Sequence, residues 1–213
     1  SFIREKVFTY LVYFGIPDKA YSYPKQLSAG QQQRAAIARA MVIEPALLLL
    51  DEPFANLDKN LKVETAEFIR GIQKKLGTTT VSVTHDQEEA FAMSDSIGIL
   101  IAGRLVQLNT TRNVYYTPAS WEAAKFLGPV NRIPSSLFSS LRIKAEGKEV
   151  LARAEALSVR LDPEGQGTIE KVCFVGAMIL IDIKIDGVLL KSTSFNGNLE
   201  EGNKVSIEVL HYF

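Results

Sequence analysis

Four consecutive leucines, Leu47 to Leu50, run directly into the acid pair Asp51-Glu52. An apolar run this short, without alternating polar residues, is typical of a strand covered on both faces of a parallel sheet. Ligands of open parallel sheets bind outside the carboxyl ends of the strands, where the two acids lie. The run predicts an α/β layer in which Asp51 could hold Mg²⁺ and Glu52 could polarise a water molecule. A pair of solvated loop acids is the alternative.

Helix and strand patterns alternate around this strand. Apolar residues recur at helical spacing in 2–14, 31–43 and 57–76, and short apolar runs at 79–83 and 97–102 predict strands. Asp86 and Glu89 predict a capping box at the start of a helix over 86–93. Gly15 and Gly77 are expected to end helices. Strands and helices in this order predict right-handed crossovers.

The pattern changes after about Asn131, where apolar residues begin to alternate with polar ones. Strands are predicted at 157–161, 179–185, 188–193 and 205–209, and Asp186-Gly187 is a tight-hairpin signal. We therefore expect two domains, 1–131 and 132–213, of which the second is a small all-β domain of barrel type. The second domain contains no acid pair or phosphate loop, so no chemistry is assigned to it. Cys173 is expected to pack against its neighbours rather than to be a reactive thiol.

Charge and composition narrow the classes of function. Lys+Arg and Asp+Glu each total 24, so the net charge is zero and no basic field indicates a nucleic-acid partner. The single cysteine excludes an internal disulfide and suits a reducing compartment. Together with His85 and His211 it matches no familiar zinc spacing. No apolar run approaches the roughly 18 residues that span a bilayer.

Three further segments have a use in phosphate chemistry. Leu27-Ser28-Ala29-Gly30-Gln31 places a hydroxyl and a glycine where a helix begins, and free N–H groups there can bind an anion. An ordinary N-capped helix is an equally good interpretation. His85 follows a strand and could contact a γ-phosphate, although a lone histidine more often has a structural role. Asp58 near a helix start is more often a cap.

In this order and spacing, the segments resemble the nucleotide-binding subunit of ATP-binding cassette (ABC) transporters, which would make the fold a partial P-loop NTPase core with a helical subdomain. The matching segments are the signature loop at 27–31, the Walker B strand at 47–52, the D-loop at 55–58 and the switch histidine His85. The resemblance covers about residues 2–131. Residues 84–90 resemble importers of iron, sulfate, polyamines or sugars, and the β domain resembles their transport-associated OB-type (TOBE) domain.

The resemblance implies a role for each matched residue. Asp51 would lie beside Mg²⁺, Glu52 would be the general base and His85 would sense the γ-phosphate of ATP. Contacts to ATP held by the second subunit of a head-to-tail dimer would come from Ser28, Ala29, Gly30 and Gln31, and Asp58 would cross the same interface. The resemblance further implies transmembrane permease partners, an indirect role for a periplasmic or surface binding protein, and a peripheral position at the cytoplasmic face of the membrane.

Two departures from the family stand out. Ala29 occupies a position where the family usually has glycine. The phosphate-binding pattern G-x-x-x-x-G-K-[ST] occurs nowhere, and the only Gly-Lys pair, Gly147-Lys148, is followed by Glu149. We therefore expect a fragment that lacks the Walker A half and is inactive alone. The alternatives are a non-catalytic regulatory piece whose β domain docks or senses an effector, and an ABC protein of DNA repair or translation.

Overall fold

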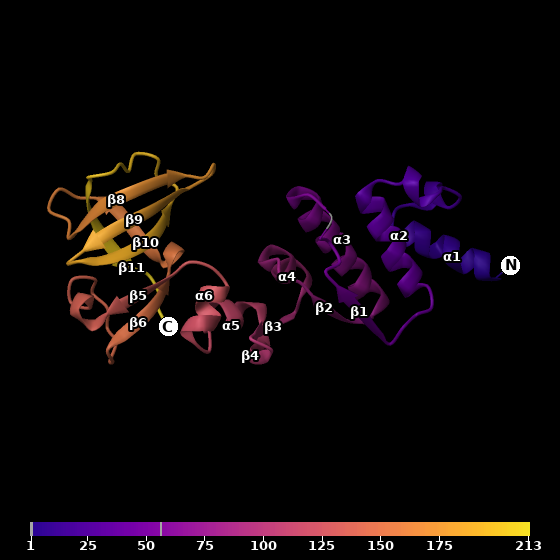
Figure 1. Ribbon diagram of the computed structural model, residues 1–213, viewed down its shortest axis with the longest axis horizontal. Helices are drawn as coiled ribbons and strands as arrows, with labels where there is room; N and C mark the ends of the chain where they lie inside the picture. Colours follow the sequence, from indigo (N-terminus) through magenta and orange to yellow (C-terminus); the bar gives the residue numbers. More distant parts are fainter. Residues whose placement is uncertain (1, 56) are drawn as a thin grey trace. The chain divides into compact units, whose positions relative to one another are not determined.

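The computed structural model describes residues 2–55 and 57–213, and the chain divides into two compact units, Ser1–Ile97 and Gly98–Phe213 (Figure 1). Each unit has its own cluster of buried hydrophobic residues. The residues of the first cluster come from the range Tyr10 to Met93 of the sequence, and those of the second come from Ile133 to Ile207. The boundary expected at 131/132 falls inside strand β5 (Val130–Pro134) and stays a prediction.

The helices of the first unit follow the apolar spacing of the sequence. They are α1 (Phe2–Tyr13), α2 (Ala29–Met41), α3 (Lys59–Leu76) and α4 (Gln87–Met93), with 3-10 turns η1 (Pro17–Lys19) and η2 (Pro24–Gln26). Gly77, with a φ angle of 66°, directly follows α3, and Gly15, with a φ angle of 68°, lies two residues after the end of α1. Both glycines therefore end their helices as predicted, because the left-handed conformation disfavours other residues.

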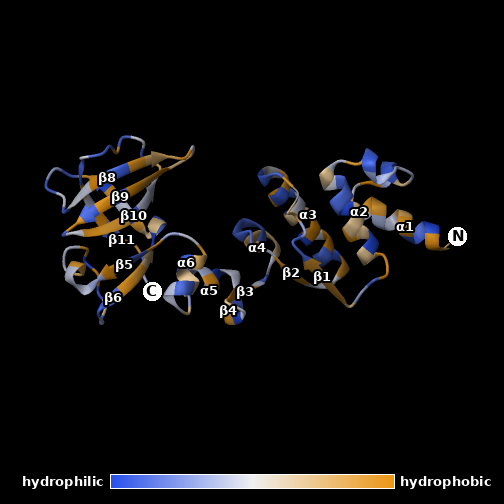
Figure 2. Ribbon diagram, in the orientation of Figure 1, coloured by the Kyte–Doolittle hydropathy of each residue, from blue (hydrophilic) through white to orange (hydrophobic). Residues whose placement is uncertain are grey.

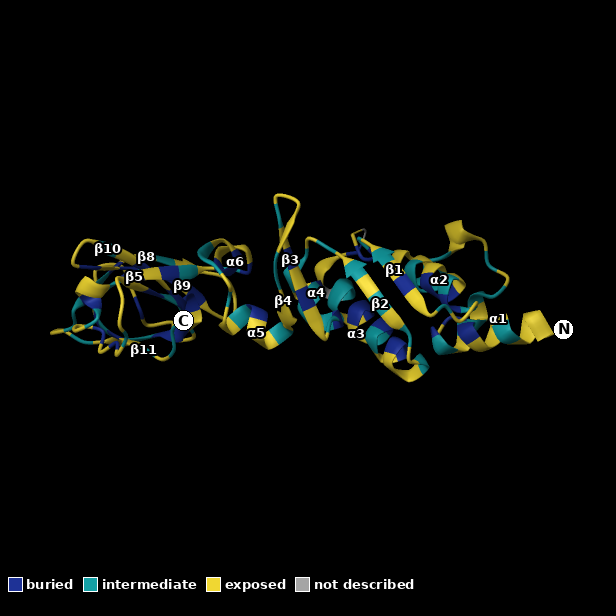
Figure 3. Cartoon of the chain, turned by 90° about the horizontal axis from the view of Figure 1, so that it is seen from below, coloured by how far each residue is buried: buried dark blue, intermediate teal, exposed yellow. Residues whose placement is uncertain are grey.

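The acid pair lies at the end of a parallel strand pair. Strand β1 (Leu47–Asp51) pairs in parallel with β2 (Thr79–Val83), Asp51 stands opposite Val83, and α3 is the crossover between the strands. Leu48 is buried, but Leu47 and Leu49 are 49% and 69% exposed, and exposed positions alternate along β1 and β2 (Figure 3). Within the described residues the pair is covered on one face, so the expected cover on both faces is wrong.

The third predicted strand does not join this pair. Strand β3 (Ser96–Ile101) instead forms a two-stranded sheet with β4 (Arg104–Thr110). Ala102 and Gly103 between them have φ angles of 49° and 75°, the conformation of a two-residue hairpin turn. A tight turn pairs each strand with its sequence neighbour, which the apolar pattern of 97–102 did not indicate.

The second unit is built around a β-sheet domain. Its sheet has the order β10-β9-β8-β11-β7, with hydrophobic residues concentrated in the strands and hydrophilic ones in the connecting loops (Figure 2). The strands are β7 (Leu157–Leu161), β8 (Gly167–Phe174), β9 (Ile179–Ile185), β10 (Val188–Ser194) and β11 (Lys204–Val209). Asp186 and Gly187, with φ angles of 46° and 83°, form the predicted hairpin between β9 and β10.

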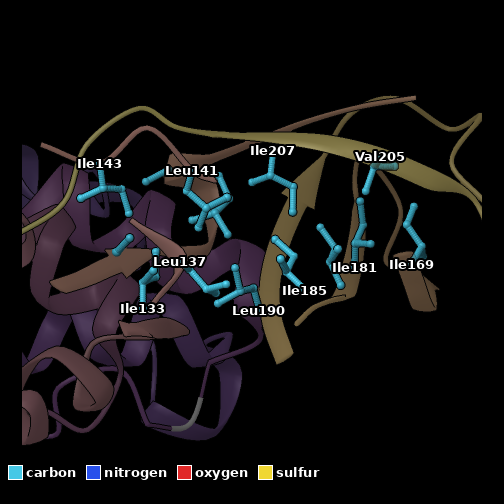
Figure 4. Packing of buried hydrophobic residues seen from close by; sticks show 14 of the residues in the cluster. Ile133, Leu137, Leu141, Ile143, Ile169, Ile181, Ile185, Leu190, Val205 and Ile207 are labelled. Atoms are coloured by element: carbon cyan, nitrogen blue, oxygen red, sulfur yellow. The ribbon is translucent and has the colours of Figure 1, made fainter. Parts of the chain in front are cut away.

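The two ends of this sheet approach each other. Ser192 of β10 donates its hydroxyl to the Leu157 carbonyl of β7 over 2.8 Å, so the two edge strands contact each other through this side chain, and the expected barrel stays a prediction. Val205 and Ile207 of β11 point toward Ile181 and Ile185 of β9 across the interior (Figure 4). The domain is thus held by interdigitating aliphatic side chains.

Shorter elements connect β4 to the sheet. They are α5 (Thr111–Tyr116), α6 (Trp121–Phe126), β5, η3 (Ser135–Leu137), β6 (Glu149–Arg153) and η4 (Ala154–Ala156), and β5 pairs antiparallel with β6. Asn131 of β5 accepts from Lys191 N–H over 2.6 Å and donates to the Lys191 carbonyl over 2.8 Å. This amide replaces a strand partner along β10, so β5 is tied to the larger sheet.

Arg153 is a fully buried cation in the second unit. Its guanidinium donates to the carbonyls of Ala124 and Tyr115 over 2.7 and 3.1 Å, and it lies 4.2 Å from the centroid of the Tyr115 ring. These carbonyls belong to the last turns of α5 and α6, and the Ala124 carbonyl also accepts from the Leu127 N–H over 3.2 Å. Arg153 thus anchors both helices on β6.

Candidate functional site

Glu52 is the residue that follows β1. Its N–H donates to the Val83 carbonyl over 2.9 Å, which extends the β1–β2 pairing by one bond. Its φ of 46° lies in the left-handed region that a glutamate rarely adopts. The pairing therefore holds a strained backbone, and such strain concentrates at functional sites.

His85 lies directly against this carboxylate. Its Nδ1 atom is 2.7 Å from Oε1 of Glu52, although 33 residues separate the two in the sequence. Because an ionised carboxylate only accepts, Nδ1 is the donor. The His85 side chain is 75% exposed, so it is available to a ligand. The parallel pairing of β1 and β2 brings together the two residues assigned to catalysis from the sequence.

The charges around His85 favour its protonated form. The hydrogen bond to Glu52, followed by the charge of that carboxylate, raises the pKa of His85 above its usual 6.5. The positive charge of Lys62 lowers this pKa, whereas the negative charge of Asp86 raises it, as that of Glu52 does. A protonated imidazole has a donor at both nitrogens, so Nε2 can donate to an anion while Nδ1 stays on Glu52.

The turn after His85 differs from the predicted capping box. Asp86 caps α4 by accepting from the Glu89 N–H over 3.2 Å, but its own N–H donates to the Thr84 hydroxyl over 3.0 Å. The Glu89 side chain is buried, and this burial raises the pKa of its carboxyl. The reciprocal bond predicted for Glu89 is replaced by Thr84, so only half of the box forms.

The signature segment forms a complete capping box. Ser28 Oγ accepts from the Gln31 N–H over 3.3 Å, and Gln31 Oε1 accepts from the Ser28 N–H over 3.0 Å. Gly30 is buried, and a Cβ atom there would come 3.4 Å from Cδ2 of Leu61 in α3. The structure thus explains the serine at 28 by the helix cap and the glycine at 30 by its close packing against α3. Their predicted contact with ATP stays a prediction.

The remaining predicted residues lie at element ends. Asp58 caps α3 by accepting from the Leu61 N–H over 3.0 Å, and Ala29 is the first residue of α2. Asp51 is exposed at the last position of β1. Asn56, in the predicted D-loop, lies outside the described residues. The described part of the chain holds no cluster of three or more metal-ligating side chains.

Sequence reasoning missed two lysines beside His85. Lys62 pairs with Asp86 over 3.1 Å, and Lys59 pairs with Glu88 over 2.8 Å, so two ion pairs join the start of α3 to the start of α4. Both lysines, His85 and Asp86 line an open cleft of about 480 Å³. The apolar periodicity of 57–76 indicates a helix but carries no information on which lysine meets which acid.

Comparison with known families gives a match at the start of the chain. The model of the family described as "ABC transporter" matches residues 4–55, which include the signature segment, β1 and Glu52. No helix in the described residues is long and apolar enough to span a bilayer.

The chain is also similar to ATP-binding proteins of import systems. It is 38% identical over 82% of its length to the sulfate/thiosulfate import ATP-binding protein CysA 2 of Chromobacterium violaceum, of which it covers 53%. It is 44% identical over 74% of its length to the Fe(3+) ions import ATP-binding protein FbpC of Rhizobium etli, covering 43% of it. The spermidine/putrescine import ATP-binding protein PotA of Lawsonia intracellularis is 36% identical over 96% of the chain, which covers 65% of that relative. The chain thus spans 43% to 65% of the length of these relatives.

Two solved structures resemble the fold. One is cbiO1 from Clostridium perfringens, part of the ABC transporter complex cbiONQ, with a TM-score of 0.50 and 33% identity over 52% of this chain and 44% of that one. The other is an ATP-binding cassette of an ABC transporter in its ADP conformation, with a TM-score of 0.51 and 21% identity over 58% of this chain and 50% of that one. The chain therefore has part of the α/β fold of ABC ATPases, combined with a β-sheet domain.

Proposed function

We propose that this chain belongs to the ATP-binding and ATP-hydrolysing subunit of an ABC import system. The observation that carries the proposal is the 2.7 Å contact between Glu52 and His85 at the carboxyl end of the β1–β2 pair. Similarity to the ATP-binding proteins of sulfate, iron and polyamine importers supports it. These relatives have different named substrates, so the proposal assigns none.

The pair Glu52–His85 can divide the work of hydrolysis. One carboxylate oxygen of Glu52 accepts from His85, and the other can accept a proton from an attacking water. Nε2 of a protonated His85 can donate to a γ-phosphate oxygen. Phosphoryl transfer depends mainly on position and on charge stabilisation, and both side chains act in this way.

The other predicted residues would supply only some of the contacts that Mg²⁺ and ATP need. Asp51 supplies a single exposed carboxylate, which suits Mg²⁺ only together with phosphate and water oxygens. Bound Mg²⁺ would neutralise charge on the phosphates. The start of α2 would place Ser28 to Gln31 against ATP held by a second subunit, where the positive end of the helix dipole favours an anion, and Asp58 would lie at the same interface.

The partners and location follow from the same proposal. A head-to-tail ATPase dimer would work with transmembrane permease subunits, at the cytoplasmic face of the membrane, and with a binding protein indirectly. The β domain is proposed to be transport-associated. The regulatory alternative is less well supported, because the relatives are ATP-binding proteins over 74–96% of this chain.

The test compares the chain alone with a chimera. The chain is fused behind the phosphate-loop half of the Chromobacterium relative, and release of phosphate from ATP is measured with and without Mg²⁺. We expect Mg²⁺-dependent release from the chimera and none above buffer background from the chain alone, because its sequence lacks the phosphate-loop lysine. A folded chimera that neither binds nor hydrolyses ATP would contradict the proposal.

A further inference from the structure

We propose that Lys62 is a positioning residue that holds His85 on Glu52 by anchoring Asp86. Only the consequence of this inference for ATP hydrolysis rests on the proposed function. Its geometry and its test concern the chain itself. Lys62 lies near the start of α3, and Asp86 is the residue next to His85.

The Asp86 carboxylate is fixed at both oxygens. Oδ2 accepts from Lys62 Nζ over 3.1 Å, and Oδ1 accepts from the Glu89 N–H over 3.2 Å. The Asp86 N–H is held as well, by the Thr84 hydroxyl over 3.0 Å. His85 therefore lies between Thr84 and Asp86, which are hydrogen-bonded to each other. The ion pair between Asp86 and Lys62 ties this turn to α3.

The exposed His85 ring has little else to hold it. A side chain with 75% exposure packs against few neighbours, so its direction depends on the backbone turn and on the bond to Glu52. Loss of the Lys62 contact frees the Asp86 carboxylate and with it the turn. The ring then leaves Glu52, because an exposed hydrogen bond competes with water on nearly equal terms.

The neighbouring ion pair provides a matched control. Lys59 and Glu88 join the same two helices over 2.8 Å, but their side chains are 77% and 57% exposed, against 18% and 28% for Lys62 and Asp86. Exposed pairs contribute little, because water and salt screen them. Glu88 is also farther along the chain from His85 than Asp86 is. Lys59 should therefore not position the histidine.

The position of Lys62 also connects two predicted functional elements. Asp58 caps α3, and Lys62 lies four residues later, about one helical turn along the axis. A displacement of the start of α3 would therefore move Lys62, Asp86 and His85 together. If Asp58 contacts a second subunit, the Lys62–Asp86 ion pair passes that contact to the Glu52–His85 pair.

The test is an NMR titration of the imidazoles in the isotope-labelled chain. Only His85 and His211 contribute signals, and His85→Gln identifies the His85 set. Two quantities are measured for His85: its pKa, and which ring nitrogen carries the proton when the ring is neutral. The parent should show a raised pKa and a proton on Nδ1, since Nδ1 donates to Glu52.

Lys62→Met separates positioning from simple charge. Removal of the lysine charge alone would raise the pKa of His85, because Lys62 lowers it. Loss of the contact with Glu52 would lower it. We expect a fall, together with a shift of the neutral-state proton to Nε2, while Lys62→Arg keeps both parent values and Lys59→Met leaves both unchanged.

The opposite outcomes overturn the inference. A raised or unchanged pKa with the proton still on Nδ1 in Lys62→Met would show that Lys62 acts through charge or not at all. An equal fall in Lys59→Met would show a general effect of the helix pair. If Lys62→Met does not fold by circular dichroism, Lys62→Gln takes its place under the same criteria. A chimera without ATPase activity would overturn the proposed function but not this inference.

Discussion

His85 Nδ1 donates to Glu52 Oε1 over 2.7 Å, and the glutamate that receives this bond has a φ angle of 46°. This backbone conformation is disfavoured for a glutamate, and the hydrogen bond to the histidine after the next strand holds the carboxylate in place. A carboxylate and an imidazole donor are thereby held together at the carboxyl end of the β1–β2 pair.

This contact determines how the histidine ionises. The pKa of His85 is raised mainly by its hydrogen bond to Glu52, so Glu52→Gln should lower it toward 6.5. A raised pKa in the folded state stabilises the fold below the unfolded pKa, and the contribution disappears as the pH rises through the folded value. NMR titration of the two histidines gives the result directly, with His211 as the internal control. An unchanged His85 value would show that the contact does not exist in solution.

Ala29 is expected to tolerate glycine. It is the first residue of α2 and has a helical backbone, so the methyl group causes no strain there. Ala29→Gly should lower stability by less than about 1 kcal/mol, because glycine is a poorer helix former. The ATPase rate of the chimera should stay within about twofold of the parent, a small change in activation free energy. A tenfold loss of rate would mean that the Ala29 methyl itself contacts a ligand or partner.

Arg153 is expected to be essential for the second unit. Replacement by methionine removes the guanidinium bonds to the Ala124 and Tyr115 carbonyls, and we expect a loss of about 3 kcal/mol in the free energy of unfolding. Trp121 in α6, the single tryptophan, reports the unfolding by fluorescence in urea. Arg160→Met, at an exposed position in β7, is the control. Equal stability of the two variants would contradict an anchoring role for Arg153.

The β domain should require more of the chain than its alternating strands. Residues 98–213 are expected to unfold cooperatively as an isolated piece, because they form a compact unit with their own core. A piece beginning at Ser135 loses β5, and with it the buried Ile133 and the Asn131 bonds to Lys191. We expect it to melt at a lower temperature or without a cooperative transition. Equal thermal melts for both pieces would show that β5 is dispensable.

Local signals made much of this fold predictable. The helices of the first unit, the glycine caps and the Asp186-Gly187 hairpin follow from spacing and turn chemistry within a few residues. Contacts between distant segments could not be predicted in this way. The β3–β4 pairing depends on positive φ angles at Ala102 and Gly103, and alanine carries little turn signal.

The same distinction between local signals and contacts of distant segments applies to the candidate site. Glu52 was predicted from its position after a strand and His85 from the resemblance to ABC transporters, and the parallel pairing brings them into contact. The lysine partner of Asp86 was not predicted, because a lysine on the polar side of a helix has many acids within reach. Arg153 was missed as well, since a lone arginine between alanines gives no indication of the carbonyls that it meets.

The most direct test of the account is Glu52→Gln in the chimera. Glutamine keeps the shape of the side chain but cannot take a proton from water, so the rate of phosphate release should fall by about 10²–10⁴-fold. ATP should remain bound, and sizing in ATP and Mg²⁺ should show a nucleotide-dependent dimer. Glu67→Gln, at an exposed position on α3, should leave the rate unchanged. A Glu52→Gln chimera that releases phosphate at the parent rate would contradict the assignment of Glu52 as the general base.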